Sequence, residues 1–337
     1  MLQKQAKPAA LPGIFPTLAA GFELTTRYLW LVLIPAVLDL FLWIGPRLSF
    51  RPLIESLAAQ MPQQALVMDP VPLLEAFAGR LNHFTYLAVS LVGVPALMTG
   101  LTPEKTPVQP LLIERAGWGE WFGFLVLFTL SGLLLAAVYY SLIAYTLRRA
   151  GASAMGIPMP PVHLTRRTLR TFFRLIGLTA LFLAIVAVIV FPMTFLAGFM
   201  SLFSQTLAML MLMGALLVII WLAMFLSYTP QGMVLNPHGF WRTLTESVRL
   251  FRENLPASLG LIFFVSLAKR LLSFILLTAD TGSWITAINL IAHAYISTAL
   301  IMALFIFYRD RYSAFLRQSQ PQPDAVQMKQ EVYDQQE

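Results

Sequence analysis

The sequence contains no cysteine among its 337 residues, and charged residues make up only 12% of it. The absence of cysteine excludes disulfides, thiolate metal sites and cysteine nucleophiles. Soluble globular domains contain about 25% charged residues, whereas this chain is 58% hydrophobic and has a mean hydropathy of +0.72. The composition therefore excludes a soluble domain and predicts an all-α integral membrane protein that crosses the bilayer several times.

Residues that would indicate enzyme chemistry are also scarce. The four histidines lie far apart in the sequence and form no HExxH-type pair of metal ligands. The chain has no P-loop and no dinucleotide-binding glycine pattern. No Ser/His/Asp set and no pair of carboxylates can be placed on one helical face. We therefore expect no enzyme activity, and no catalytic residue, metal site or cofactor.

Six apolar runs are long enough to cross a bilayer, since a spanning helix needs about 20 apolar residues. The expected spans are 28–46, 121–145, 175–200, 207–229, 257–279 and 285–307. The first two are joined by a long connection, residues 47–120, in which the apolar stretch 84–100 is interrupted by Gly93 and Pro95. We expect residues 84–100 to form a re-entrant or interfacial hairpin, with a seventh span as the alternative.

The expected domain organisation follows from these spans. Residues 1–27 form an N-terminal segment with an interfacial helix, and residues 28–309 form the six-helix transmembrane domain. Residues 310–337 form a polar tail, which we expect to be disordered. The N-terminus has no short apolar core with a small-residue cleavage site, so the first span is expected to act as an uncleaved insertion signal.

Arginines are distributed unevenly between the connections. The linker 146–174 carries six arginines and no acidic residue, whereas the turns 201–206 and 280–284 carry no basic residue. Because positively charged loops remain in the cytoplasm, we expect the linker and both termini there and the connection 47–120 on the outer side. The net charge of +7 suits an anionic membrane surface, and no nucleic-acid partner is expected.

The stretch Gly239–Phe264 begins as an amphipathic helix and continues into the fifth span. The residues expected to bind the membrane interface are the apolar Trp241, Leu244, Val248 and Phe251 and the basic Arg242, Arg249 and Arg252. Such a helix is typical of the headgroup layer, so the lipid bilayer and its anionic headgroups are expected partners. Substitution of Thr243, on the polar side, is expected to have little effect. A helix packed on protein is the alternative.

A similar amphipathic pattern recurs twice closer to the N-terminus. It precedes the first span between Phe15 and Leu29, and it precedes the third span over residues 162–174. We therefore predict three repeats of an interfacial helix plus a transmembrane hairpin, with the second and third interfacial helices at 162–174 and 239–255.

Ionisable residues inside spans are costly and indicate candidate sites. The helical rise of about 1.5 Å per residue places the ionisable residues of three spans at a similar depth, together with polar neighbours on the last helix. This predicts a buried polar cluster of Asp39, Lys269, Arg270, Asn289, His293 and Ser297. Asp39 is expected to neutralise Lys269 or Arg270, and the cluster is either a structural pair, a proton relay or a substrate anchor.

Two segments resemble a known group of proteins. They are NPHGFWRTLTESVRLFRENLPASLGL, residues 236–261, and HAYISTALIMALFIFYRDR, residues 293–311. Both are similar to uncharacterised bacterial multipass membrane proteins, which are themselves loosely similar to the membrane domain attached to some glycerophosphodiester phosphodiesterases. The resemblance covers about half of the chain and brings no catalytic residues. It implies a bacterial cytoplasmic (inner) membrane location, and the phosphodiesterase activity does not transfer because that domain is lacking here.

The function expected first is that of a non-catalytic membrane or lipid-associated accessory protein. A membrane-protein partner or a second copy of the chain would then be its further partner. The alternative is a small-solute or lipid transporter that uses the mid-membrane polar cluster. A membrane-embedded enzyme is a more distant alternative.

Overall fold

The computed structural model describes residues 11–58, 60, 80–88, 92–99, 103, 105–156, 163–278 and 281–319. The structure is about 81% helical. Two short strands, β1 (Arg47–Ser49) and β2 (Leu112–Glu114), pair in parallel. Five helices in the described part are long and apolar enough to cross a membrane, and a bent pair makes up to six. This confirms the prediction of a helical multi-pass membrane protein.

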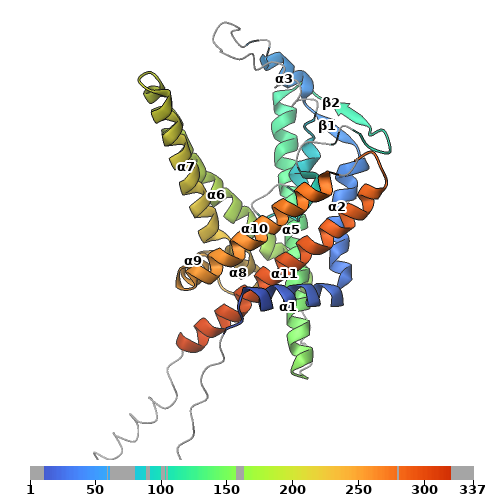
Figure 1. Cartoon of the computed structure of the whole chain (residues 1–337), viewed down its shortest axis with the longest axis vertical. Coiled ribbons are helices and arrows are strands. Elements are labelled where there is room, and N and C mark those ends of the chain that lie inside the picture. Colours follow the sequence, from blue (N-terminus) through green and yellow to red (C-terminus); the bar gives the residue numbers. More distant parts are fainter. Residues whose placement is uncertain are drawn as a thin grey trace, which may run out of the picture.

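The first expected span, 28–46, is not one straight helix. α1 (Ile14–Arg27) is followed by the short 3-10 helix η1 (Leu29–Val32) and by α2 (Leu33–Ile44). The chain turns by 93° between α1 and the segment after it, and Figure 1 shows α1 crossing α11 while α2 runs upward. Pro35 causes no break, because it lies in the first turn of α2, where its missing N–H has no helical partner.

The last helix, α11 (Ile285–Ser319), is the central element of the bundle. Its most apolar window is 72% buried, whereas the corresponding windows of α6 (Leu164–Ser201) and α7 (Gln205–Leu226) are only 11% buried. Figure 1 shows α6 and α7 as a hairpin that leans away from α5 (Trp118–Ala154). The core therefore forms around α11, and the α6–α7 hairpin presents apolar side chains to its surroundings.

The prediction of a disordered tail at 310–337 is wrong for its first ten residues, because α11 continues to Ser319. The Tyr312 hydroxyl donates a hydrogen bond to the Glu246 carboxylate at 2.9 Å, and the Arg311 guanidinium donates one to the Pro12 carbonyl at 3.3 Å. These contacts hold the end of α11 against α9 and the start of α1. Residues 320–337 lie outside the described part of the chain.

α6 corrects a second expected boundary. It is continuous through the residues expected to form a separate interfacial helix at 162–174, of which 162 lies outside the described residues. Thr171 of this segment and Leu175, the first residue after it, are buried against the protein. The run of helix-compatible residues contains no proline or glycine break at this point, so one long helix forms.

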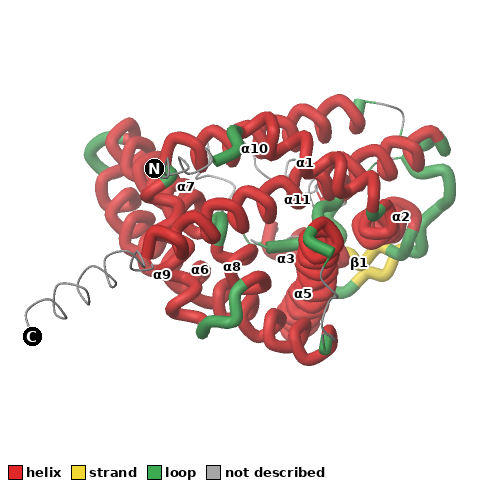
Figure 2. Tube along the Cα trace, turned by 90° about the horizontal axis from the view of Figure 1, so that it is seen from below, coloured by secondary structure: helices red, strands yellow, loops and turns green. Residues whose placement is uncertain are grey.

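The helix expected at 239–255 is present as α9 (Phe240–Glu253), but its buried face differs from the expected one. Thr243 and Ser247 are fully buried, whereas Trp241 is 66% exposed. The reason is the preceding short helix, α8 (Thr229–Leu235), whose Gly232 approaches α9 so closely that only small side chains fit. Figure 2 shows α6, α8 and α9 next to one another.

The stretch 84–100 contains no continuous helix in its described residues. It consists of two 3-10 turns, η2 (His83–Leu87) and η3 (Leu97–Thr99), and the described residues between them have no regular secondary structure. Val92, Val94 and Met98 are nevertheless buried in the main core. Such irregular backbone is tolerated at membrane depth where protein surrounds it. Helix α3 (Arg51–Ala58) follows β1 in the connection 47–120. Helix α10 (Leu255–Leu277) precedes α11.

Gly232 is expected to be a packing constraint. A Cβ atom at this position would lie 2.6 Å from the Tyr308 hydroxyl oxygen and 2.8 Å from the Ser247 hydroxyl oxygen. Gly232→Ala should therefore lower the free energy of unfolding by about 1–3 kcal/mol through overpacking. Thermal unfolding in detergent measures the effect. Gly214→Ala is the matched control, because nothing lies within 4 Å of the added Cβ, and an unchanged melting temperature for Gly232→Ala would contradict this packing.

Candidate functional site: a polar cavity beside α10 and α11

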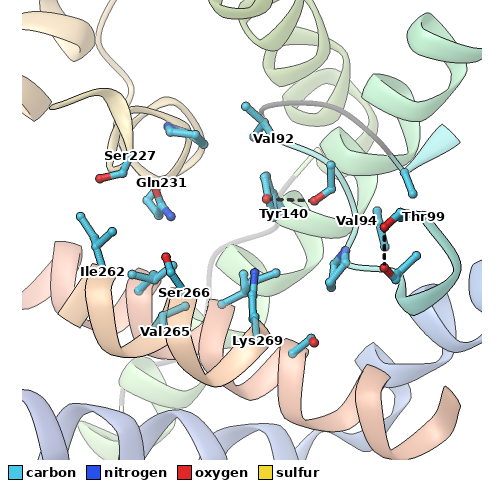
Figure 3. A pocket seen from close by; sticks show the side chains of 18 of the residues that line it. Val92, Val94, Thr99, Tyr140, Ser227, Gln231, Ile262, Val265, Ser266 and Lys269 are labelled. Carbon is cyan, nitrogen blue, oxygen red and sulfur yellow. Dashed lines mark hydrogen bonds between the residues drawn. The ribbon is translucent and has the colours of Figure 1, made fainter. Parts of the chain in front are cut away.

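A polar cavity of about 460 Å³ lies between α10, α11, the start of α8 and the segment 92–99. Figure 3 shows side chains from these elements converging on it. The polar residues that line the cavity are Thr99, Tyr140, Ser227, Gln231, Ser266, Lys269, Ser273, His293 and Ser297. Of these residues, the sequence pattern indicated only Lys269, His293 and Ser297.

α10 supplies one wall of this cavity. Ile262, Ser266, Lys269 and Ser273 all line it, because residues three or four apart share one face of a helix. Figure 3 shows the Lys269 side chain reaching from α10 into the space below Tyr140. Within the described residues, Lys269 has no carboxylate within ion-pair distance. Its positive charge therefore faces the cavity without a counter-ion among the side chains that the structure describes.

Arg270 follows Lys269 directly but does not belong to the site. It is exposed on the outer surface of α10 and does not line the cavity. Adjacent residues on a helix point about 100° apart, so a shared depth does not give them a shared face. The expected grouping of Lys269 and Arg270 is therefore wrong for Arg270.

Asp39 contacts His293 and not a basic residue of α10. One oxygen of the fully buried Asp39 carboxylate, Oδ1, accepts the Met98 backbone N–H at 2.9 Å. The other, Oδ2, lies 3.4 Å from His293 Nδ1. The expected pairing of Asp39 with Lys269 or Arg270 is thus corrected. α2 packs against α11, which places the carboxylate beside the imidazole.

His293 continues this polar chain towards the cavity. Its Nε2 atom lies 3.2 Å from the Ser297 hydroxyl oxygen, one helical turn further along α11. His293 and Ser297 line the cavity, while Asp39 lies behind them. The order is Asp39 Oδ2, His293 Nδ1, His293 Nε2 and Ser297 Oγ. The Asp39 carboxylate therefore lies beside one nitrogen of the imidazole, and the Ser297 hydroxyl lies beside the other.

Asn289, the remaining member of the expected cluster, has a structural contact. Its side-chain amide donates a hydrogen bond to the Leu276 carbonyl at 3.1 Å, which joins α11 to the end of α10. Of the six expected residues, the structure brings Lys269, His293 and Ser297 to the cavity and Asp39 next to it.

Sequence reasoning missed Tyr140 and Gln231. Tyr140 donates a hydrogen bond to the Gly93 carbonyl at 3.3 Å and so ties α5 to the irregular segment. Gln231 is a polar residue just beyond the fourth expected span. This position is the only feature of the sequence that could have indicated Gln231 as a cavity residue.

The residues expected at the membrane interface of α9 divide into two groups. Arg242 and Arg249 are exposed, and they form ion pairs with Glu246 at 2.8 Å and with Glu253 at 2.7 Å. These carboxylates offset the charge that was expected to attract anionic headgroups. Trp241 and Arg252 are exposed, whereas Leu244, Val248 and Phe251 are partly or fully buried in protein.

Comparison with protein-family models, with curated proteins and with solved structures gives no match for this chain. The resemblance of residues 236–261 and 293–311 to bacterial multipass proteins therefore stays an expectation. Among the residues that the structure describes, no three His, Asp or Glu side chains come together as metal ligands.

A double-mutant cycle tests the corrected partner of Asp39. Asp39→Asn and His293→Gln should show a coupling energy of about 0.5–3 kcal/mol, since contacting polar residues are not additive. Asp39→Asn combined with Lys269→Gln should be additive within about 0.5 kcal/mol. Unfolding free energies in detergent provide the measurement. Stronger coupling of Asp39 to Lys269 than to His293 would restore the pairing expected from the sequence.

Proposed function

We propose that this chain is a transporter that binds a small anionic solute, or the anionic head of a lipid, in the cavity beside α10 and α11. The observation that carries the proposal is the Lys269 side chain, which faces this cavity without a described carboxylate partner. Lys269 is partly buried, and a cation that is removed from water without a counter-ion is destabilising. An anionic ligand would supply the missing charge, and charged residues at membrane depth are characteristic of substrate pathways.

The size and lining of the cavity support this proposal. A volume of about 460 Å³ lies within the range of about 300–1,000 Å³ common for small-molecule sites. Its hydroxyl and amide groups would hydrogen-bond a polar ligand. The non-helical segment at residues 92–96 borders it, as broken backbone borders the substrate sites of many transporters.

A non-catalytic accessory role, the first expectation from the sequence, stays a prediction. The cavity gives a specific observation in favour of the transporter, so we place transport first. The proposed location is the bacterial cytoplasmic membrane with both termini inside. The six arginines of residues 146–174, at the end of α5 and the start of α6, support this orientation, because basic segments next to spans remain in the cytoplasm.

An internal repeat is part of the same proposal, and it is supported by α1 and α9. Each helix has 14 residues and begins after a glycine, Gly13 or Gly239. In each, the threonine four residues later, Thr17 or Thr243, is buried and donates its backbone N–H to that glycine. α6 departs from this pattern because its corresponding segment is continuous with the span.

Lys269→Gln tests the proposed site, with Arg270→Gln as the matched control. A panel of carboxylates, phosphates and sulfonates is screened for thermal stabilisation of the purified protein, and the ligand found is then tested for uptake into proteoliposomes. Lys269→Gln should weaken binding at least tenfold, which corresponds to about 1.4 kcal/mol, and should reduce uptake. Arg270→Gln should retain both. No stabilising anion, or equal losses in the two variants, would contradict the proposal.

A second candidate function, acyl transfer to water, is favoured by the order of atoms in the Asp39–His293–Ser297 chain. The same order occurs in serine hydrolases. The Ser297 oxygen would attack a carbonyl carbon while its proton passes to His293 Nε2, and Asp39 would stabilise the resulting imidazolium. The imidazolium would then give this proton to the leaving group as its bond to the carbonyl carbon breaks, and water would release the acyl group from Ser297. Distances of 3.2 and 3.4 Å are long but common before substrate binds. Ser297 lies inside α11, so its own N–H is used within the helix. We therefore place this candidate second.

Covalent labelling tests the hydrolase candidate. A fluorophosphonate probe should label the wild-type protein and Ser266→Ala but not Ser297→Ala, because Ser297 is the only described serine of the cavity that contacts a histidine. Labelling is read on a gel after incubation of membranes containing each variant. An unlabelled wild-type protein would remove this candidate and leave the transporter.

A further inference from the structure

A second cavity lies at the lower end of the molecule, where α6 begins. The 38 residues of α6 extend about 57 Å at 1.5 Å per residue, which exceeds the hydrocarbon thickness of about 30 Å. The first turns of α6 therefore project beyond the hydrocarbon core. Together with the α8–α9 connection they enclose a cavity of about 300 Å³. Its basic lining residues are His163, Arg166, Arg167, Arg170 and Arg174.

Arg174 forms the rigid wall of this basic cavity. Its guanidinium donates hydrogen bonds to the carbonyls of Met233 at 2.9 Å, Asn236 at 3.4 Å and also His238. Arg148 of α5 donates to the carbonyls of Val234 at 3.1 Å and Leu235 at 3.3 Å. Arginine side chains can satisfy the last carbonyls of a helix in this way.

The other three arginines of the basic cavity donate no such hydrogen bonds to backbone carbonyls in the described part of the chain. Arg166, Arg167 and Arg170 have no carboxylate within ion-pair distance among the described residues, in contrast to Arg242 and Arg249 of α9. Like charges held together repel each other, and a multivalent anion relieves that repulsion. Guanidinium groups suit phosphate in particular, because their planar donors match its oxygens in pairs.

An apolar groove of about 550 Å³ adjoins the basic cavity and shares Arg170 and Arg174 with it. Its other lining residues are Phe173, Gly177, Leu181, Phe240 and Trp241. Phe173, Gly177 and Leu181 step by four along α6, so the groove follows this helix from the basic cavity towards its spanning part. The exposed Trp241 forms its rim, as tryptophans do at headgroup level.

We infer that the basic cavity and the apolar groove form one binding site for a phospholipid with an anionic headgroup. The phosphate contacts Arg166, Arg167 and Arg170, and an acyl chain lies along Phe173 and Leu181. The continuity of the two cavities favours a lipid over free phosphate, because phosphate alone would leave the groove unused. This site is separate from the cavity of Lys269 and does not depend on the transport proposal.

Lipid binding is measured with the purified protein in detergent, by native mass spectrometry and by thermal stabilisation. The probes are phosphatidylglycerol, phosphatidylcholine and inorganic phosphate. The wild-type protein should retain phosphatidylglycerol in preference to phosphatidylcholine. Replacing Arg166, Arg167 and Arg170 by Gln should weaken phosphatidylglycerol binding at least tenfold, while replacing Arg242, Arg249 and Arg252 by Gln should not.

A groove variant, Leu181→Asn, separates the two sources of phosphate. It should weaken phosphatidylglycerol binding and leave the effect of inorganic phosphate unchanged. Lys269→Gln should bind phosphatidylglycerol normally, so failure of the transport proposal would leave this result intact. Equal retention of the two lipids by the wild-type protein would overturn the inference, and this comparison needs no variant. Binding of inorganic phosphate without a preference for the anionic lipid would also overturn it.

Discussion

The carbonyl groups at the end of α8 impose the constraint on which both cavities depend. Backbone polar groups inside a membrane protein must find partners within the protein, and α8 ends in the interior of the bundle. Arg148 and Arg174 satisfy these carbonyls from α5 and α6. They thereby fix the short helix between three longer ones. One end of α8 presents Gln231 to the polar cavity, and the other presents Met233 and Asn236 to the basic cavity.

Close packing completes this arrangement. Gly232 brings α8 against Thr243 and Ser247 of α9 and against Tyr308 of α11. A similar approach occurs where Gly21 of α1 meets the backbone of Ala299 on α11, 2.6 Å from where a Cβ atom would lie. Small residues at such crossings let helices approach closely, which is how dispersion forces stabilise bundles in lipid. α1 and α9 therefore use small-residue faces towards protein, in addition to their amphipathic character.

The charges of the chain fall into two classes that the structure separates. Arg242 and Arg249 have carboxylate partners on their own helix, and Asp39 has His293. Lys269 and the first arginines of α6 have no such partner among the described residues, and each of these groups faces a cavity. Unpaired charges that face cavities are the ones that can bind a ligand of opposite charge. The proposed transport site and the proposed lipid site both contain charges of this second kind.

The sequence by itself determined the features that depend on local pattern. Hydropathy identified the multi-pass architecture, and the amphipathic phase identified α9. Counting residues along spans brought Asp39, Lys269 and His293 to a similar depth. Tertiary structure decided every feature that depends on rotation about a helix axis and on the neighbouring helix. In the tertiary structure Arg270 points away from the cavity that Lys269 faces, Asp39 contacts His293, and Thr243 is buried against Gly232. Tertiary structure also bent the chain near Tyr28 and joined the basic cavity to its apolar groove. The physical reason is that helical rise is the same for every residue, so depth follows from residue number. The partners of a side chain depend instead on which helices pack beside the face on which it lies.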